Sequence, residues 1–308
     1  MEVITACDLM KKEIPVPLMI VGEILPAGLT IFAGKPKIGK SWFALNLAVA
    51  VASGEPFLGR EADAGEALYL ALEDTWGRLQ NRVRKILGKA GNAPDTLSLA
   101  TTCSPLDKGG DRDIENWLKK SDRPRLVVVD VLQKVRGEDK KARAYENDYE
   151  ALKPLKMVSD RYGVSVLAVT HTRKLEGGGD RFDLVSATTG LVGAADHAMI
   201  LDRGEEGLSL YGRGRDVNEF CLALSFDGER GTFSDAGDPE DRARSESRRR
   251  ILDALMAAGK PLGPSDLAKV SGISAGIVRQ HLTRMVKDGE VERIGRGNYI
   301  ALGRYGGA

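Results

Sequence analysis

The spacing of apolar residues along the chain predicts buried strands that alternate with helices. Runs of consecutive apolar residues are typical of strands covered on both faces, and a repeat near 3.6 residues is typical of an amphipathic helix. The expected strands span residues 29–33, 66–72, 97–100, 125–130 and 164–170. The expected helices span residues 41–52, 76–90, 113–120 and 147–161. This alternation predicts an α/β fold, with a mostly parallel sheet and helices on both faces.

The pattern changes in the last third of the chain. Short apolar runs at residues 198–201, 208–211 and 221–226 are separated by turns, and we expect them to add antiparallel strands at one edge of the sheet. Residues 234–245 have almost no apolar content, which is typical of a linker. The expected division is a first domain over residues 1–235, a linker over 236–245 and a second domain over 246–308.

The second domain has the pattern of three helices followed by a hairpin. The helices are expected at residues 246–258, 264–272 and 274–287, and the hairpin strands at 291–294 and 299–302. This arrangement resembles a winged helix. In the third helix, the apolar residues expected to be buried are Ile277, Val278, Leu282 and Met285.

The third helix of a winged helix usually enters the major groove of DNA. The side chains expected to contact DNA are Arg279, Gln280 and Arg284 on this helix and Arg296 in the hairpin turn. Winged helices also serve as protein-docking modules, and this is the alternative.

The charge is unevenly distributed between the two expected domains. The 308 residues carry a formal net charge of +1, which argues against a global field for nucleic acid. From Glu246 onward, however, the formal charge is +5, against −4 for the residues before it. This asymmetry predicts a basic appendage on a mildly acidic body.

The cysteines and the apolar runs bear on location. Cys7, Cys103 and Cys221 are far apart and odd in number, with neither metal-binding nor disulfide spacing, as expected in a reducing cytoplasm. No apolar run approaches the length of a membrane span, and the N-terminus lacks a secretory pattern. We therefore expect a cytoplasmic protein without a membrane partner.

The segment 34–41 fits the phosphate-loop pattern Gly-x-x-x-x-Gly-Lys-Ser at every fixed position. It follows an expected strand and opens an expected helix, so its backbone N–H groups and the helix N-terminus would face one phosphate chain. Lys40 would reach the β- and γ-phosphates, and the Ser41 hydroxyl would hold Mg²⁺. The expected nucleotide contacts are Gly34, Lys35, Pro36, Lys37, Ile38, Gly39, Lys40, Ser41 and Trp42. We therefore expect ATP and Mg²⁺ as cofactors.

Three further polar residues end apolar strands, where the ligand crevice of a parallel sheet lies. Asp130 stands where a second magnesium ligand is expected, with a strand-end cap as the alternative. Glu73 is placed to polarise the attacking water, although the adjacent Asp74 competes for this role. His171 is placed to sense the γ-phosphate, or is simply a satisfied histidine at a strand end.

These residues together resemble the RecA-type ATPase core. The runs 22–29 and 52–59 narrow the resemblance to the RepA-like branch of hexameric replicative helicases, over about residues 15–235. The resemblance implies a catalytic Glu73, magnesium at Ser41 and Asp130, and a γ-phosphate sensor at His171. It also implies that Arg82 packs against the nucleotide base, with Arg78 as its competitor.

Ring ATPases complete each site with arginines from the neighbouring subunit. Arg213 and Arg215 resemble the Lys-x-Arg element of DnaB-like enzymes, and we expect them to act in this way. The chain departs from RepA helicase at residues 196–199, which carry no arginine where that helicase has one. The alternative is a glycine-rich basic turn.

Two segments, 133–146 and 173–189, follow the strand-end motifs and are expected to face a central channel. Their expected contacts to single-stranded DNA are Lys134, Arg136, Arg173, Lys174 and Arg181. Acidic neighbours dilute this charge, so ordinary solvated loops are the alternative.

The sequence therefore predicts a Mg²⁺-dependent ATPase that binds DNA as a homo-oligomeric, hexameric ring, a replicative helicase of a plasmid or prophage. The alternative is a nucleotide-gated DNA-binding regulator or loader, which uses ATP for assembly rather than for unwinding.

Overall fold

The computed structural model describes two compact units, Met1–Asp235 and Ala236–Ala308. The residues described are 3–13, 17–89, 91–137, 144–172, 182, 189–204, 207–237, 239–295 and 297–302. Each unit is treated separately below.

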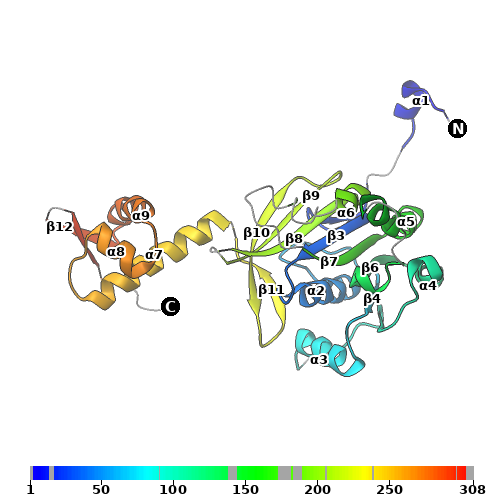
Figure 1. Ribbon diagram of the computed structural model, residues 1–308, viewed down its shortest axis with the longest axis horizontal. Helices are drawn as coiled ribbons and strands as arrows, with labels where there is room; N and C mark the ends of the chain where they lie inside the picture. The colour runs from blue at the N-terminus through cyan, green and yellow to red at the C-terminus, as the bar shows by residue number, and fades with distance from the viewer. Residues whose placement is uncertain are drawn as a thin grey trace. The chain divides into compact units, whose positions relative to one another are not determined.

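A single large sheet organises the first unit (Figure 1). Within the described residues, nine strands pair in the order β11-β10-β9-β8-β3-β7-β6-β4-β5. The six strands from β8 to β5 are parallel, and β9, β10 and β11 continue the sheet in antiparallel pairing. The bounds are β3 (Gly28–Gly34), β4 (Glu66–Ala71), β5 (Leu97–Ala100), β6 (Pro124–Asp130), β7 (Ser165–His171), β8 (His197–Gly204), β9 (Gly207–Gly214), β10 (Phe220–Asp227) and β11 (Thr232–Asp235).

One of the three added strands differs from the sequence prediction. The run 198–201 lies in β8, which pairs with β3 in parallel rather than antiparallel orientation. A parallel pair needs a crossover connection, and the short helix α6 (Thr189–Ala194) belongs to it. The sequence prediction missed α6 because six residues are too few to show a helical repeat. The antiparallel orientation expected for the other two runs is confirmed by β9 and β10.

Helices cover both faces of the sheet and bury two apolar clusters (Figure 1). The helices α2 (Lys40–Ser53) and α3 (Trp76–Leu87) cover one face; α4 (Gly110–Leu118), α5 (Ala144–Tyr162) and α6 cover the other. Successive side chains of β3 alternate between the clusters, with Phe32 in the first and Ile31 and Ala33 in the second. The apolar runs read as doubly covered strands are therefore confirmed.

The smaller elements of the first unit lie before and between these. They are α1 (Ala6–Met10), β1 (Met19–Val21), β2 (Leu25–Pro26), and the 3₁₀ helices η1 (Leu106–Lys108) and η2 (Leu132–Lys134). Thr5 caps α1 by accepting a hydrogen bond from the Asp8 N–H, and α1 buries none of its side chains.

The second unit contains three helices and a hairpin around its own core. They are α7 (Pro239–Ala258), α8 (Pro264–Ser271), α9 (Ala275–Lys287), β12 (Val291–Ile294) and β13 (Asn298–Ala301). The three-helix and hairpin pattern predicted from the sequence is confirmed. The buried core includes Ile251, Leu267, Val278, Leu282 and Met285.

Two details of the second unit correct the sequence prediction. Residues 239–245, expected to be linker, are helical and begin α7, because a polar, charged segment still propagates as helix when an apolar turn follows it. Ile277, expected to be buried, is 46% exposed. Neighbouring residues of a helix point about 100° apart, so Ile277 lies beside the buried face that carries Val278 and Leu282 rather than on it.

Among the described residues, the helices are all too short or too polar to cross a membrane.

Phe43 of α2 ties the face of the sheet to the antiparallel hairpin. Its ring lies 4.9 Å from Phe32, 5.1 Å from Phe57 and 5.3 Å from Phe233 between centroids, and its side chain is 1% exposed. We expect Phe43→Ala to destabilise the first unit by about 3–5 kcal/mol, because the cavity it leaves collapses only in part. The melting temperature should fall by at least about 6 °C.

Intrinsic tryptophan fluorescence is the suitable readout, since Trp42, Trp76 and Trp117 all belong to the first unit. Met157→Ala, at a side chain that is 52% exposed, is the control and should leave the transition in place. Equal melting of both variants would contradict the assignment of Phe43 to the core.

Candidate nucleotide-binding site

The loop between β3 and α2 curls around the ammonium group of Lys40. Lys40 Nζ donates hydrogen bonds to the carbonyl oxygens of Gly34, at 2.7 Å, and Lys35, at 2.9 Å. Gly39 has φ 112°, a left-handed conformation that favours glycine. A Cβ on Gly34 would lie 2.5 Å from the Leu201 carbonyl oxygen, so the strand end has no room for a side chain. The expected phosphate loop therefore has the backbone shape that the motif requires.

Lys40 is an electrostatically costly residue at this position. Its side chain is buried, and burial lowers the pKa of its ammonium group to about 8, against the attraction of Asp130 and Glu73. Its Nζ also lies 3.1 Å from His171 Nδ1. Burial and the charge of Lys40 lower the pKa of His171, so at neutral pH this imidazole is uncharged and accepts a hydrogen bond from Lys40.

The polar residues predicted at strand ends lie together at the carboxyl ends of the parallel strands. The strand pairing sets Gly34 opposite His171, and Ala71, two residues before Glu73, opposite Asp130. Asp130 and Glu73 are both near enough to raise the pKa of Lys40. The structure therefore brings Lys40, Glu73, Asp130 and His171 together, as the parallel arrangement predicts.

Asp130 is 5% exposed and is held by a tyrosine that the sequence analysis did not single out. The Tyr69 hydroxyl donates to Asp130 Oδ2 at 2.5 Å, and its ring is buried in β4. Burial raises the pKa of Asp130, and the hydroxyls of Tyr69 and Ser41 oppose this effect. Tyr69 carries the polar side-chain atom in the otherwise aliphatic run 67–71, and that is the signal that could have found it.

The second oxygen of Asp130 is available to a ligand. Asp130 Oδ1 is buried and, within the described part of the chain, accepts no hydrogen bond. Such an atom is costly unless something binds it, and a carboxylate beside a serine hydroxyl is a donor set that suits Mg²⁺. The residues present therefore fit the metal that the sequence predicts.

Glu73 and Asp74 are clearly distinguished by their contacts. Asp74 is 7% exposed and forms ion pairs with Arg78 Nε at 2.8 Å and Arg82 Nη1 at 2.7 Å. Glu73 is 53% exposed, and its ion pair with Lys134 is long, at 3.9 Å. Asp74 therefore organises the start of α3, while the Glu73 carboxylate is open to solvent.

Trp42 and Arg82 lie beside the loop as a stacked pair. The Arg82 guanidinium carbon is 5.3 Å from the centroid of the Trp42 ring, in the range of a cation–π contact. Arg78, its competitor for the base, is 62% exposed and donates to the Glu73 carbonyl oxygen at 3.1 Å. Of the two, Arg82 is the one that borders the loop through Trp42.

Arg213 and Arg215 lie away from the phosphate loop of their own chain. Arg213 pairs with Ala198, and Ala198 pairs with Ile31, whereas the loop begins at Gly34. The Arg213 guanidinium instead lies 4.0 Å from the centroid of the Phe182 ring. Arg215 follows β9 and lies near the amino-terminal ends of the parallel strands, whereas the phosphate loop lies at their carboxyl ends. Neither arginine therefore serves the site in cis.

The predicted DNA contacts are scattered over both units. Lys134 is exposed and Arg136 is partly buried, and on α9 the side chains of Arg279, Gln280 and Arg284 are exposed. The other predicted contacts lie outside the described residues: Arg173, Lys174, Arg181 and Arg296.

The bond between Tyr69 and Asp130 can be removed with little change in volume. We expect Tyr69→Phe to lower stability by about 1–3 kcal/mol, because it leaves a buried carboxylate oxygen without a donor. Tyr149→Phe, at a side chain that is 45% exposed, is the matched control and should melt like the wild type. Thermal unfolding followed by tryptophan fluorescence compares the two, and equal melting temperatures would contradict the role of Tyr69.

Nucleotide affinity should depend on the protonation of Lys40. A bound phosphate favours the charged ammonium, so affinity is greatest below the pKa of about 8 and falls as pH rises above it. Titrations with a fluorescent ADP analogue should show a loss of up to about tenfold per pH unit above that point. Lys40→Met should bind weakly with no such slope, and a slope that persists in this variant would assign it to another group.

Comparisons with known proteins give a family for each unit. Residues 4–177 match the AAA domain family, and residues 244–292 match a family of winged helix-turn-helix DNA-binding domains. A search of curated protein sequences found no match.

Solved structures share the fold of the first unit. One is an ATPase domain, with a TM-score of 0.55, 14% identity and coverage of 68% of this chain and 84% of that one. Another is a DnaB-like replicative helicase, solved for its interactions with primase, with a TM-score of 0.55, 14% identity and coverage of 74% and 66%. At this identity the likeness establishes a RecA-like fold. The family match spans more than half of the residues, and the chain therefore belongs to the AAA domain family, with a winged helix-turn-helix unit after the nucleotide-binding fold.

Proposed function

We propose that the protein is a Mg²⁺-dependent ATPase that couples hydrolysis to DNA binding, as a ring-forming replicative helicase of the RepA-like type. The observation that carries this proposal is the meeting of Lys40, Glu73, Asp130 and His171 at the carboxyl ends of the parallel strands. Phosphoryl transfer needs positioning and charge stabilisation more than covalent chemistry, and these groups supply both.

Lys40 and the loop amides would hold the phosphates. In the structure Lys40 is bound by two carbonyl oxygens of the loop and by His171. A triphosphate offers the same ammonium a stronger, charged acceptor, so nucleotide would draw Lys40 away from these partners. Once Lys40 has moved, the proton of the His171 imidazole could lie on Nδ1, and this N–H would donate a hydrogen bond to the γ-phosphate and report it to the segment that follows β7.

Mg²⁺ would be held by Ser41 and by the free oxygen of Asp130, and would supply neutralisation of the charge on the phosphate oxygens. Among the described residues, no group of three or more histidine, cysteine or acidic side chains is placed to hold a metal by itself. Magnesium usually keeps several waters and is bound through one or two carboxylates together with substrate phosphates.

Glu73 would polarise the attacking water. Its carboxylate is half exposed and only weakly paired, so it is accessible to a water at the γ-phosphate. Asp74, the competitor, is buried between two arginines and is not available for this role.

DNA binding and ring formation rest on other features. The winged helix unit exposes Arg279, Gln280 and Arg284 on one helix, and the residues from Glu246 onward carry a formal charge of +5. The likeness to a DnaB-like replicative helicase supports a ring-forming assembly, and single-stranded DNA would lie in its channel. Arg213 and Arg215, which lie away from their own loop, would act in trans on the nucleotide of a neighbouring subunit.

The winged helix also favours a second candidate function. A ring helicase does not need such a unit, whereas a nucleotide-gated DNA-binding regulator or loader does. In that case ATP binding would control assembly, and duplex DNA would be the main ligand.

The variant Glu73→Gln tests the hydrolysis step. We expect its steady-state ATPase rate, with and without single-stranded DNA, to fall by roughly 100-fold or more, because general-base groups contribute about that much. Affinity for a non-hydrolysable ATP analogue should change little, since the loop and Lys40 are intact. Glu229→Gln, an exposed acid in the turn between β10 and β11, is the control and should keep the wild-type rate.

The outcome for the wild type separates the proposals. A wild-type protein without ATPase activity would remove the enzyme, and ATPase without strand separation would remove only the helicase. Electron micrographs with the ATP analogue and single-stranded DNA then distinguish a ring from a regulator. Sequence-specific duplex binding by a protein that forms no ring would favour the regulator.

A further inference from the structure

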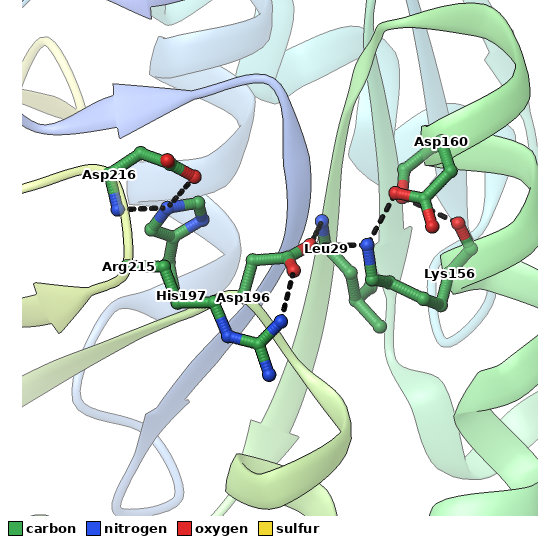
Figure 2. A network of polar contacts seen from close by, with 8 residues as sticks. Leu29, Lys156, Asp160, Asp196, His197, Arg215 and Asp216 are labelled. Carbon is green, nitrogen blue, oxygen red and sulfur yellow. Dashed lines mark hydrogen bonds and ion pairs between the residues drawn. The ribbon is translucent and has the colours of Figure 1, made fainter. Parts of the chain in front are cut away.

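A partly buried carboxylate, Asp196, lies at the amino-terminal ends of β3 and β8, away from the phosphate loop at the other end of β3. Figure 2 shows its contacts. Asp196 directly precedes β8, and its side chain is 10% exposed. Asp196 Oδ2 accepts a hydrogen bond from the Leu29 N–H at 2.9 Å and lies 3.1 Å from Lys156 Nζ. Asp196 Oδ1 lies 3.7 Å from Arg215 Nη1. One carboxylate therefore joins β3, α5 and the turn after β9.

The contact with Arg215 is part of a two-residue clamp. The Arg215 N–H donates to the Asp196 carbonyl oxygen at 3.1 Å. The next residue of each segment pairs as well, with Asp216 Oδ2 lying 3.2 Å from His197 Nε2. Figure 2 shows both pairs side by side. Two consecutive residues at the start of β8 thus hold two consecutive residues after β9.

Glycines allow these side chains to pack directly on the strands. A Cβ on Gly28 would lie 2.9 Å from Asp196 Oδ2, and a Cβ on Gly214 would lie 2.1 Å from His197 Cδ2. Both distances are too short for a real side chain. The clamp therefore has little freedom to shift, and the backbone at Arg215 is held in place.

Arg215 itself is anchored at one end and open at the other. Its side chain is 71% exposed, although its guanidinium lies near the partly buried carboxylate of Asp196. Lys156, the other cation on Asp196, is the more enclosed of the two and is also paired with Asp160. A cavity of about 350 Å³ beside Arg213 and Arg215 leaves room for a group from outside the chain.

We propose that Asp196 is a positioning residue that orients Arg215 toward the nucleotide of a neighbouring subunit. This proposal rests on the proposed function, in which Arg215 acts in trans. A largely exposed arginine must be ordered before it stabilises a transition state, and a small misplacement is costly. Asp196 and the adjacent pair His197–Asp216 provide this order in advance.

Asp196→Asn is the primary test, since the amide oxygen still accepts the Leu29 N–H but no longer attracts the guanidinium. We expect kcat for ATP to fall by about 10- to 100-fold, as for a misplaced catalytic group, with nucleotide affinity within about twofold of the wild type. The double variant Asp196→Asn/Arg215→Ala should be no slower than Arg215→Ala, because both changes remove one interaction.

Asp160→Asn is the matched control. Asp160 binds the same lysine as Asp196 but does not contact Arg215, so this variant should keep the wild-type kcat. Thermal melting accompanies each assay. If Asp196→Asn melts below the assay temperature, Asp196→Glu takes its place; it keeps the charge, displaces it by one methylene and should give the same loss.

Mixed oligomers separate positioning from simple damage to the subunit. A Lys40→Met subunit supplies an intact Arg215 without using ATP, and an Asp196→Asn subunit keeps an intact phosphate loop. The mixture should therefore hydrolyse ATP faster than the sum of the two variants alone. The absence of any gain on mixing would overturn the proposal.

The remaining outcomes distinguish this inference from the function on which it rests. If Arg215→Ala is slow and Asp196→Asn is fast, the positioning role is wrong and the trans arginine stands. If Arg215→Ala keeps the wild-type rate, the positioning role of Asp196 and the trans role of Arg215 both fail. ATP hydrolysis that depends on Glu73 would still stand in that case.

Discussion

The burial of the Lys40 ammonium group is the constraint on which the nucleotide site depends. A buried cation is unfavourable unless it is paired, and the chain satisfies it with two loop carbonyl oxygens, a neutral histidine and the nearby charges of Asp130 and Glu73. None of these partners is a close carboxylate. The ammonium group is therefore held in place yet remains ready to exchange its neutral partners for an anion, which a tight ion pair would prevent.

The same constraint explains the pairing around Asp130. Asp130 lies near Lys40 without forming a salt bridge to it, because the Tyr69 hydroxyl holds one oxygen of Asp130; the other oxygen accepts no hydrogen bond within the described residues. Asp74, which follows Glu73, is neutralised by Arg78 and Arg82. Asp130, Glu73 and Asp74 thus have distinct environments, and that difference separates a structural acid from those left open to a metal or to water.

The two ends of the parallel strands are chemically different. The carboxyl ends bring together the loop, Asp130 and His171. At the amino-terminal ends, Asp196 and His197 hold the turn that carries Arg215. The strand β3 runs between them, from Leu29, which donates to Asp196, to Gly34, which accepts from Lys40. A subunit that carries the nucleotide site at one end of its strands and Arg215 at the other suits the proposed assembly, in which Arg215 of one subunit meets the nucleotide site of the next.

The sequence by itself determined the local features of this protein. Continuous apolar runs located the parallel strands, the phosphate-loop pattern located Lys40 and Ser41, and strand ends located Glu73, Asp130 and His171, because each signal is encoded within about ten consecutive residues. Only the tertiary structure decided which partners those residues have. The parallel pairing of β8, the bond from Tyr69 and the clamp at Arg215 all join segments that the periodicity of one segment does not relate. They depend on how strands align across the sheet, and the aligned residues are far apart along the chain.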